Sequence, residues 1–370
     1  MKILEINSVC GIRSTGRIVT DLAEKFIREG NECKIAYGRG TVPDKYFNLS
    51  YRIGNSQSVK INALKARLFD NEGFNARKNT KRFIEWANNY DPDVLWLHNL
   101  HGYYINIDIL FHWVKSRPQM KVIWTLHDCW AFTGHCAHFS YIHCHQWKDG
   151  CICCKQSNEY PKSLFFDNCK KNYIEKKELF TGIPNMTIIT PSYWLADLVK
   201  DSFLREYAVK VVHNTIDQDA FRPTKSSFRQ KYSIGDRFII LGVASSWSDR
   251  KGLNDFIKLS KRISSSFVIV LVGLTKKQIR KIPDNIVCIE RTNTKKELAE
   301  IYTSADVFLN LTYEDTYPTV NLEAQACGTR CITYRTGGSV ESVSPENIVE
   351  QGDLDAIMTI LDKMKENSND

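Results

Sequence analysis

Short apolar runs alternate with segments of helical periodicity along most of the chain, and this alternation predicts strands and helices in turn. Predicted strands lie at 2–7, 33–37, 93–97, 121–126, 186–190, 209–212, 238–244, 267–272, 286–289, 307–311 and 330–334. Predicted helices include one ending near residue 29 and others at 59–69, 105–114, 253–263, 295–304, 319–326 and 353–366. Because strands that alternate with helices form parallel sheets, we predict an α/β protein. A length of 370 residues is enough for two domains of ordinary size.

An acidic loop follows the predicted strand at 307–311. Glu314 and Asp315 come just past the strand end, and Glu323 lies about two turns into the next helix. The inward positions of that helix are expected to be Val320, Leu322 and Ala326. Ligands of open α/β sheets bind at the carboxyl ends of strands, and a helix N-terminus offers free N–H groups to a phosphate. The loop is therefore a predicted ligand site, with a solvated loop and a helix-capping acid as the alternative.

Two adjacent cations, Arg250 and Lys251, occupy the loop after the first strand of the second half. Cations at a helix start, beside free N–H groups, are suited to a diphosphate. A basic helix start that only faces solvent is the alternative, and the helix dipole disfavours it. Gly337 and Gly338 follow another predicted strand, where they would allow close approach of the backbone.

Composition indicates the class of protein and its expected location. Hydrophobic residues make up 43% and charged residues 25%, which is typical of globular proteins, and no run approaches the ~20 apolar residues of a membrane span. The N-terminus alternates like a strand and lacks the apolar core of a signal peptide, so we expect a cytoplasmic protein. The net charge of +8 fits anionic ligands or an anionic membrane face without identifying either.

Cysteine and histidine gather between residues 136 and 169. Structural disulfides are not expected in the cytoplasm. Cys151 and Cys154 have the spacing of a metal knuckle, and Cys136 with Cys144 would complete a tetrahedral set. Thiolate ligands of this kind suit zinc. The sequence therefore predicts a structural zinc site, with a set of reduced, buried thiols as the alternative.

The stretch from Leu311 to Gly328 resembles the acidic motif of GT-B glycosyltransferases of family 4, in which two glutamates flank seven residues and Ala-Cys-Gly-Thr follows. Here Asp315 and Glu323 flank seven residues, and Ala-Cys-Gly-Thr stands at 326–329. The run TLHDCWAFTGH at 125–135 is similar to bacterial exopolysaccharide glycosyltransferases related to the colanic-acid enzymes. The resemblance implies two Rossmann-like parallel-sheet domains facing a cleft, and a retaining reaction that needs no metal in its chemistry.

In that family the first carboxylate of the motif contacts the donor sugar and the second holds the nucleotide ribose. Asp315 stands where the family has glutamate, and whether Asp315 or Glu314 fills the first position stays open. The family's arginine before the lysine is Ser246 here, which leaves Arg250 and Lys251 for the diphosphate. The leaving phosphate itself assists the acceptor hydroxyl in such enzymes, so no protein base is assigned.

The resemblance implies further site residues. His127, beside Asp128 at a strand end, matches a histidine that the family places near the donor sugar. Gly11 and Gly16 lie in the loop after the first strand, whose spacing is not that of a dinucleotide fingerprint; a plain flexible turn is the alternative. The predicted catalytic residues are His127, Arg250, Lys251 and Asp315. The predicted donor-binding residues are Gly11, Gly16, Glu314, Thr316, Tyr317, Pro318, Thr319, Glu323, Gly337 and Gly338.

The run His213–Asp217 resembles the crossing between the two domains of the family, although Thr215 replaces a glycine. We therefore predict an N-terminal acceptor domain at 1–216 with a Cys/His-rich insertion at about 129–169, a C-terminal nucleotide-sugar domain at 217–352, and a terminal helix and tail at 353–370. The resemblance implies that this helix crosses back to the first domain.

The predicted function is transfer of a sugar from a UDP- or GDP-linked donor to a saccharide acceptor carried on a lipid such as undecaprenyl diphosphate, for capsular or exopolysaccharide synthesis. Peripheral contact with the inner face of the membrane is expected. One alternative is a GT-B nucleotide-sugar epimerase. Another is a zinc-containing nucleic-acid-binding protein, but no basic motif interleaved with aromatic residues supports it, so no nucleic-acid partner is expected.

Overall fold

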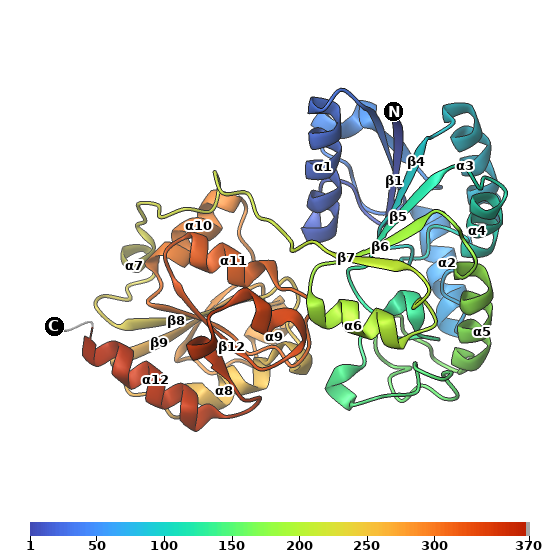
Figure 1. Ribbon diagram of the computed structural model, residues 1–370. Coiled ribbons are helices and arrows are strands. Elements are labelled where there is room, and N and C mark those ends of the chain that lie inside the picture. Colours follow the sequence, from blue (N-terminus) through green and yellow to red (C-terminus); the bar gives the residue numbers. More distant parts are fainter. Residues whose placement is uncertain (368–370) are drawn as a thin grey trace. The chain divides into compact units, whose positions relative to one another are not determined.

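The computed structural model describes residues 1–367, and the chain divides into two compact units at the bond between His213 and Asn214 (Figure 1). This division falls a few residues before the boundary predicted after residue 216. The terminal helix belongs to the second unit rather than standing apart from it.

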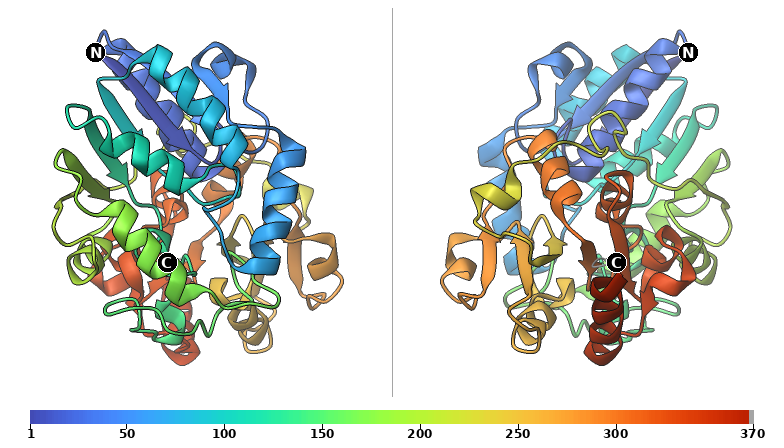
Figure 2. Two further views of the ribbon diagram at one scale, coloured as in Figure 1. Left: turned by 90° about the vertical axis from the view of Figure 1, so that its right-hand side faces the viewer. Right: turned by 90° about the vertical axis from the view of Figure 1, so that its left-hand side faces the viewer.

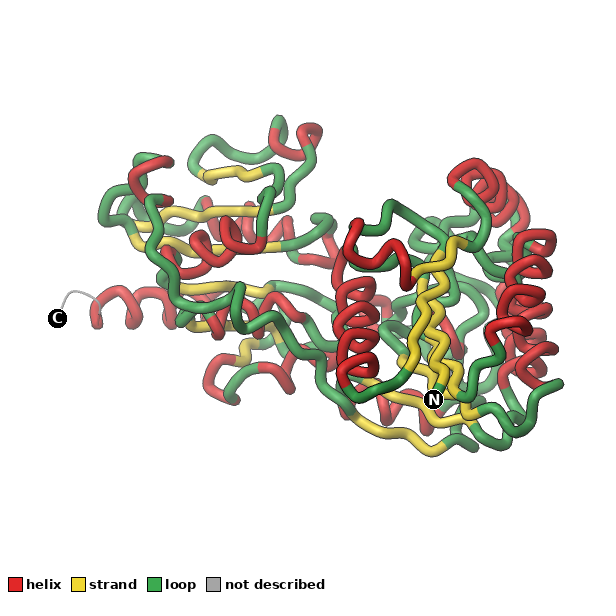
Figure 3. Tube along the Cα trace, turned by 90° about the horizontal axis from the view of Figure 1, so that it is seen from above, coloured by secondary structure: helices red, strands yellow, loops and turns green. Residues whose placement is uncertain are grey.

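The first domain is built on a seven-stranded sheet in the order β3-β2-β1-β4-β5-β6-β7, in which every pairing is parallel. Its strands are β1 (Lys2–Asn7), β2 (Glu32–Tyr37), β3 (Ser50–Arg52), β4 (Val94–Leu97), β5 (Lys121–Thr125), β6 (Met186–Thr190) and β7 (Ala208–Val211). Its helices are α1 (Arg13–Arg28), α2 (Ser56–Phe69), α3 (Arg77–Tyr90), α4 (Ile107–Lys115), α5 (Cys169–Phe180) and α6 (Tyr193–Asp201). Helices flank the sheet on both sides (Figure 3).

The second domain repeats this plan with a six-stranded parallel sheet in the order β10-β9-β8-β11-β12-β13. Its strands are β8 (Phe238–Val243), β9 (Phe267–Val272), β10 (Ile286–Ile289), β11 (Val307–Asn310), β12 (Arg330–Tyr334) and β13 (Ile348–Val349). Its helices are α7 (Phe228–Lys231), α8 (Leu253–Ser260), α9 (Lys276–Ile279), α10 (Lys295–Ser304), α11 (Thr319–Ala326) and α12 (Leu354–Asn367). The predicted α/β class is thus confirmed.

Central strands are apolar on both faces because helices cover both. Every residue of β9 is buried, and β8 is buried from Phe238 to Gly242. β1 breaks this rule, since Glu5 and Asn7 are fully buried within it. A buried carboxyl in a central strand needs polar partners, and Glu5 finds them in His98 and Cys33.

The terminal helix corrects one expectation. We expected it to cross back to the first domain, but its apolar side packs into the core of the second. Leu354, Ile357 and Leu361 of α12 share a cluster with residues of α8 and β9. Arg262, just beyond α8, forms an ion pair with Asp355, and α12 runs beside α8 in Figures 1 and 2.

The periodicity analysis missed the short elements α7, α9 and β13, and it also missed β3, α3 and α5. The strand β3 has only three residues, which is too short for a pattern. The helix α3 buries few large apolar side chains between many polar ones. The helix α5 buries Asn172 and Lys176 alongside its apolar positions, so its inward face is not apolar throughout. These elements were missed because they are too short, or because polar side chains occupy their inward positions, so no apolar periodicity is visible.

Among the residues that the structure describes, no helix combines the length and the hydropathy that a membrane crossing requires.

Candidate nucleotide-sugar site

The cations and the acidic loop of the second domain meet at one edge of its sheet. β8 and β11 are parallel neighbours, so the loops that follow them lie together at their carboxyl ends. The ammonium group of Lys251 lies 2.5 Å from Oδ2 of Asp315, and Nη1 of Arg250 donates to the carbonyl oxygen of Glu314 at 3.0 Å. The structure therefore brings together residues that are about sixty positions apart in the sequence.

A glycine allows this close approach. Gly252 has φ of +76°, and a Cβ atom there would lie 2.1 Å from the carbonyl oxygen of Leu311. The N–H of Tyr313 donates to the carbonyl oxygen of Arg250 at 2.8 Å. The loop after β8 is thus attached by its backbone to the loop after β11, and this fixes where Arg250 and Lys251 stand.

Asp315 is held from several sides. Its carboxylate accepts from Lys251 and from the N–H of Tyr317, at 3.2 Å, and its carbonyl oxygen accepts from the N–H of Gly338 at 3.1 Å. A Cβ atom on Gly337 would lie 2.1 Å from that carbonyl oxygen. The close backbone approach predicted for this glycine pair is thus made to the acidic loop. The side chain of Glu314 is buried, so Asp315 is the carboxylate that faces Lys251.

The helix α11 turns polar side chains inward, which corrects the predicted inward positions. Val320, Leu322 and Ala326 are only half-buried, whereas Asn321 and Glu323 are buried. Asn321 accepts from Asn310 at 2.7 Å and donates to Ser342 at 2.8 Å. These hydrogen bonds compensate the burial of polar groups, and they orient α11 on the sheet.

Glu323 has a partner that the sequence did not reveal. The hydroxyl of Tyr302, on α10, donates to Oε2 of Glu323 at 3.1 Å. Burial, and then the charge of Glu323, raises the pKa of Tyr302 well above its ordinary value, so the phenol keeps its proton and remains a donor. Tyr302 therefore fixes the rotamer of the carboxylate predicted to hold a ribose.

In the first domain, four titratable side chains line a small pocket at the carboxyl ends of β4 and β5. They are His98, His101, His127 and Asp128. Nε2 of His101 lies 2.8 Å from Oδ2 of Asp128, and its Nδ1 lies 2.8 Å from the hydroxyl of Tyr160. Burial favours the neutral form of Asp128, but His101, His138 and the N–H of Trp130 together hold the pKa of Asp128 well below its ordinary value. The sequence singled out His127 but not His98 or His101, although HNLH at 98–101 after a strand was a usable signal.

Gly11 and Gly16 come together in the loop after β1. The N–H of Gly11 donates to the carbonyl oxygen of Gly16 at 3.0 Å, and Gly11 has φ of +70°. A Cβ atom on Gly11 would lie 2.8 Å from Cδ of Pro43. Gly11 is therefore needed for packing of the loop itself, and the predicted role of both glycines toward the donor stays a prediction.

The predicted zinc ligands do not converge. Within residues 1–367, no three His, Cys, Asp or Glu side chains are placed to share a metal ion. Cys136 and Cys154 instead hydrogen-bond to each other, which lowers the pKa of Cys154 to about 7, and the sulfur of Cys151 accepts from the N–H of Gly134 at 3.2 Å. Cys144 is half-buried against the same core. The four predicted cysteines thus do not form a tetrahedral zinc site among the described residues. Their spacing in the sequence could not show in which direction each thiol points.

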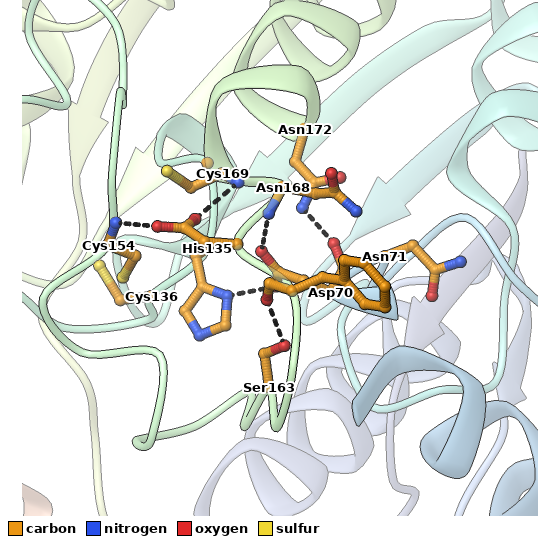
Figure 4. Close-up of polar contacts among 12 residues, drawn as sticks. Asp70, Asn71, His135, Cys136, Cys154, Ser163, Asn168, Cys169 and Asn172 are labelled. Carbon is orange, nitrogen blue, oxygen red and sulfur yellow. Dashed lines mark hydrogen bonds and ion pairs between the residues drawn. The ribbon is translucent and has the colours of Figure 1, made fainter. Parts of the chain in front are cut away.

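Asp70 ties the Cys/His-rich insertion to the body of the first domain (Figure 4). Its Oδ1 lies 2.5 Å from Nδ1 of His135, and its Oδ2 accepts from the N–H of Asn168 at 2.7 Å. Its carbonyl oxygen accepts from the amide of Asn172 at 2.6 Å. The insertion is thus ordered by one buried carboxylate at the end of α2.

Comparisons with known proteins find similarity to glycosyltransferases. Residues 224–370 match the family model described as glycosyl transferases group 1. The chain is 26% identical over 228 residues to the putative colanic acid biosynthesis glycosyl transferase WcaC of Escherichia coli, covering 59% of this chain and 55% of WcaC. It is 24% identical over 188 residues to N-acetyl-alpha-D-glucosaminyl L-malate synthase of Bacillus anthracis, covering 49% and 46%. The matches thus span about half the length of these curated relatives.

Solved structures resemble the whole chain. The sucrose-phosphate synthase of Thermosynechococcus elongatus superposes with a TM-score of 0.68 at 14% identity, covering 98% of this chain and 89% of that one. Anabaena HepE in complex with UDP superposes with a TM-score of 0.65 at 14% identity, covering 100% and 91%. At such identities the likeness establishes the fold.

Proposed function

We propose that this chain, whose second domain belongs to the glycosyl transferases group 1 family and whose fold is that of GT-B glycosyltransferases, is a retaining glycosyltransferase that uses a nucleotide-sugar donor. The observation that carries the proposal is the meeting of Lys251 and Arg250 with the acidic loop at the carboxyl ends of β8 and β11. The two cations and the helix N-terminus can bind a diphosphate, and the carboxylate beside them can accept hydrogen bonds from a sugar.

Each donor group has a candidate partner in the second domain. Lys251 and Arg250 take the diphosphate, whose negative charge grows as the glycosidic bond breaks. Asp315 accepts from sugar hydroxyls, and Glu323, oriented by Tyr302, accepts from the ribose hydroxyls. HepE of Anabaena, which has a similar fold, has been solved with UDP and with UDP-glucose. These two structures support a uridine-linked donor here.

We propose a lipid-linked saccharide as the acceptor and a peripheral position at the membrane. The likeness to WcaC supports polysaccharide synthesis. An exposed surface of the first domain supports the lipid: Leu164, Phe165 and Phe166 are exposed beside the outer side of α2, and the ring of Phe166 stacks on that of Phe69, 6.1 Å between centroids. We call this the α2 surface, and it comprises Lys60, Ile61, Leu64, Lys65, Arg67, Phe69, Lys162, Leu164, Phe165 and Phe166.

The charges of the α2 surface match an anionic bilayer. The helix α2 carries basic side chains and no acidic one. Glu159 and Asp167 flank the exposed segment, but the α2 surface as a whole carries four cations, Lys60, Lys65, Arg67 and Lys162. Exposed aromatic and aliphatic side chains surrounded by lysine and arginine are the composition that binds the interface of anionic membranes.

Thermal stabilisation by a panel of nucleoside diphosphates, measured beside a single-stranded oligonucleotide, tests the proposal. We expect one diphosphate to raise the melting temperature and the oligonucleotide to leave it unchanged. Stabilisation by the oligonucleotide alone would contradict the proposed donor site and favour a nucleic-acid-binding protein.

A further inference from the structure

One buried carboxylate of the second domain has no part in the donor contacts proposed above. Asp255 lies in α8, and its side chain is buried. Its Oδ2 accepts from the hydroxyl of Tyr313 at 2.7 Å and from the hydroxyl of Tyr334 at 3.0 Å. The two phenol rings meet edge to face, 5.5 Å between centroids. A single carboxylate oxygen thus joins α8 to two segments that are distant from it in the sequence.

Each of the three joined segments continues into a part of the candidate site. The helix α8 begins two residues after Lys251. Tyr313 precedes Asp315 by two residues in the loop after β11, and Tyr334 is the last residue of β12, three positions before Gly337. The hydrogen bonds of Asp255 therefore connect the segments that carry the loops after β8, β11 and β12, all within the second domain.

The backbone of Tyr313 makes the same connection from the other side. Its N–H donates to the carbonyl oxygen of Arg250 at 2.8 Å, and its carbonyl oxygen accepts from the hydroxyl of Thr336 at 2.7 Å. Tyr313 is thus attached by its backbone to the loops after β8 and β12, and by its side chain to α8. A change in the direction of its ring would therefore move Asp315 relative to Lys251.

Stability alone does not explain a carboxylate at position 255. Lys258 lies 3.2 Å from its Oδ1, but the lysine side chain is largely exposed, and ion pairs with exposed lysines contribute little. Apolar side chains of similar volume often stabilise a protein as well as a buried charge with its partners does. Burial, and then Asp255, raises the pKa of Tyr334 above its ordinary value, so this phenol keeps its proton and remains a donor. What the carboxylate provides is the geometry of its two hydrogen bonds.

We propose that Asp255 is a positioning residue of the donor site, which acts through Tyr313 and Tyr334 to fix the ion pair of Lys251 and Asp315 in the arrangement that sugar transfer requires. The proposal rests on the proposed function for its purpose. Asp255 itself takes no part in the bonds that break or form. Because preorganised charges stabilise a transition state without moving during the reaction, a displaced ion pair costs turnover before it costs nucleotide binding.

The first measurement needs no substrate and follows hydrogen–deuterium exchange in residues 312–317 and 336–339. Tyr313→Phe keeps the ring and removes only the hydroxyl that Asp255 binds. We expect exchange in both segments to become about tenfold faster, including the N–H of Gly338, which donates to the carbonyl oxygen of Asp315. Tyr334→Phe, which removes the second hydroxyl, should act in the same direction. Unchanged exchange in both variants would overturn the proposal.

Asp306→Asn is the matched control. Asp306 is also a carboxylate of the second domain with two donors, Arg229 at 2.7 Å and the N–H of Ile239 at 2.6 Å, but it precedes β11 and so lies at the opposite end of the sheet. We expect Asp306→Asn to lower the melting temperature without changing exchange in residues 312–317 and 336–339. Equal acceleration by Asp306→Asn would show a general loosening of the domain and would overturn a specific role of Asp255.

The second measurement compares turnover with nucleotide affinity. We expect Tyr313→Phe to lower kcat about tenfold and to leave the dissociation constant of the nucleoside diphosphate within about twofold of wild type. Asp306→Asn should leave both unchanged. In a Lys251→Ala background the same change should lower kcat less than about threefold, because the positioned cation is already absent. A tenfold loss in both backgrounds would mean that Tyr313 acts independently of Lys251, which would overturn the proposal.

The two measurements separate this proposal from the proposed function. Faster exchange with unchanged kcat would overturn the positioning role. Faster exchange in variants of a protein that binds a nucleoside diphosphate but transfers no sugar would support Asp255 as the residue that orders the nucleotide site, and it would refute the proposed function.

Discussion

Replacing Lys251 by alanine tests the proposed donor site most sharply. The ammonium group lies 2.5 Å from Asp315. The side chain of Lys251 is 24% exposed and that of Asp315 is 19% exposed, so water screens the charge of Lys251 only in part. If Lys251 holds the diphosphate, its interaction strengthens as negative charge grows on the leaving oxygen. Turnover should then fall more than donor affinity.

One preorganised donor to a developing negative charge is worth about a hundredfold in kcat, or roughly 2.7 kcal/mol. We expect a loss of that size for Lys251→Ala, measured by steady-state kinetics beside direct titration of the nucleotide. Lys295→Ala is a matched control, because Lys295 forms a similar ion pair with Asp217, 2.6 Å long, elsewhere in the same domain. Turnover of Lys251→Ala within about threefold of wild type would place the diphosphate elsewhere.

Three further predictions concern the ribose-binding carboxylate, the cysteine cluster and the α2 surface. Glu323→Ala should weaken nucleoside diphosphate binding by about 1.5–3 kcal/mol in calorimetry, and Tyr302→Phe by less, since Tyr302 only orients the carboxylate; unchanged affinity in a folded Glu323→Ala would remove Glu323 from the site. Protein purified without added zinc should carry less than about a tenth of an equivalent by metal analysis, whereas a full equivalent would restore the four-cysteine site predicted from sequence. Phe165→Ser with Phe166→Ser should reduce sedimentation with anionic vesicles, while Phe47→Ser, which removes an equally exposed phenylalanine of η1 (Asp44–Leu49), should not; equal loss in both would refute the α2 surface.

Periodicity recovered most of the fold because buried parallel strands read as apolar runs. β1, β6, β9 and β10 have the bounds predicted for them. The helices α3 and α5 were missed because polar side chains such as Asn172 and Lys176 face inward. Periodicity assumes that inward positions are apolar, and it fails where hydrogen bonds compensate the burial of polar groups.

The candidate site was also predicted only in part. The spacing of Asp315 and Glu323 and the pair Arg250–Lys251 could be read from the sequence, and the structure joins them through Lys251 and Asp315. The partnership of Tyr302 with Glu323 could not, because it depends on how α10 packs against α11. The four cysteines had a knuckle spacing, but the directions of the thiols are set by the fold of the insertion.

The most direct test of the account is to follow a nucleotide sugar by NMR in the presence of the enzyme and polyprenyl-diphosphate saccharides, choosing the nucleotide that stabilises the protein. The account predicts that nucleoside diphosphate appears in step with a glycosidic product that keeps the anomeric configuration of the donor. A nucleotide sugar that keeps its nucleotide while its sugar is epimerised, or a product of inverted configuration, would contradict it.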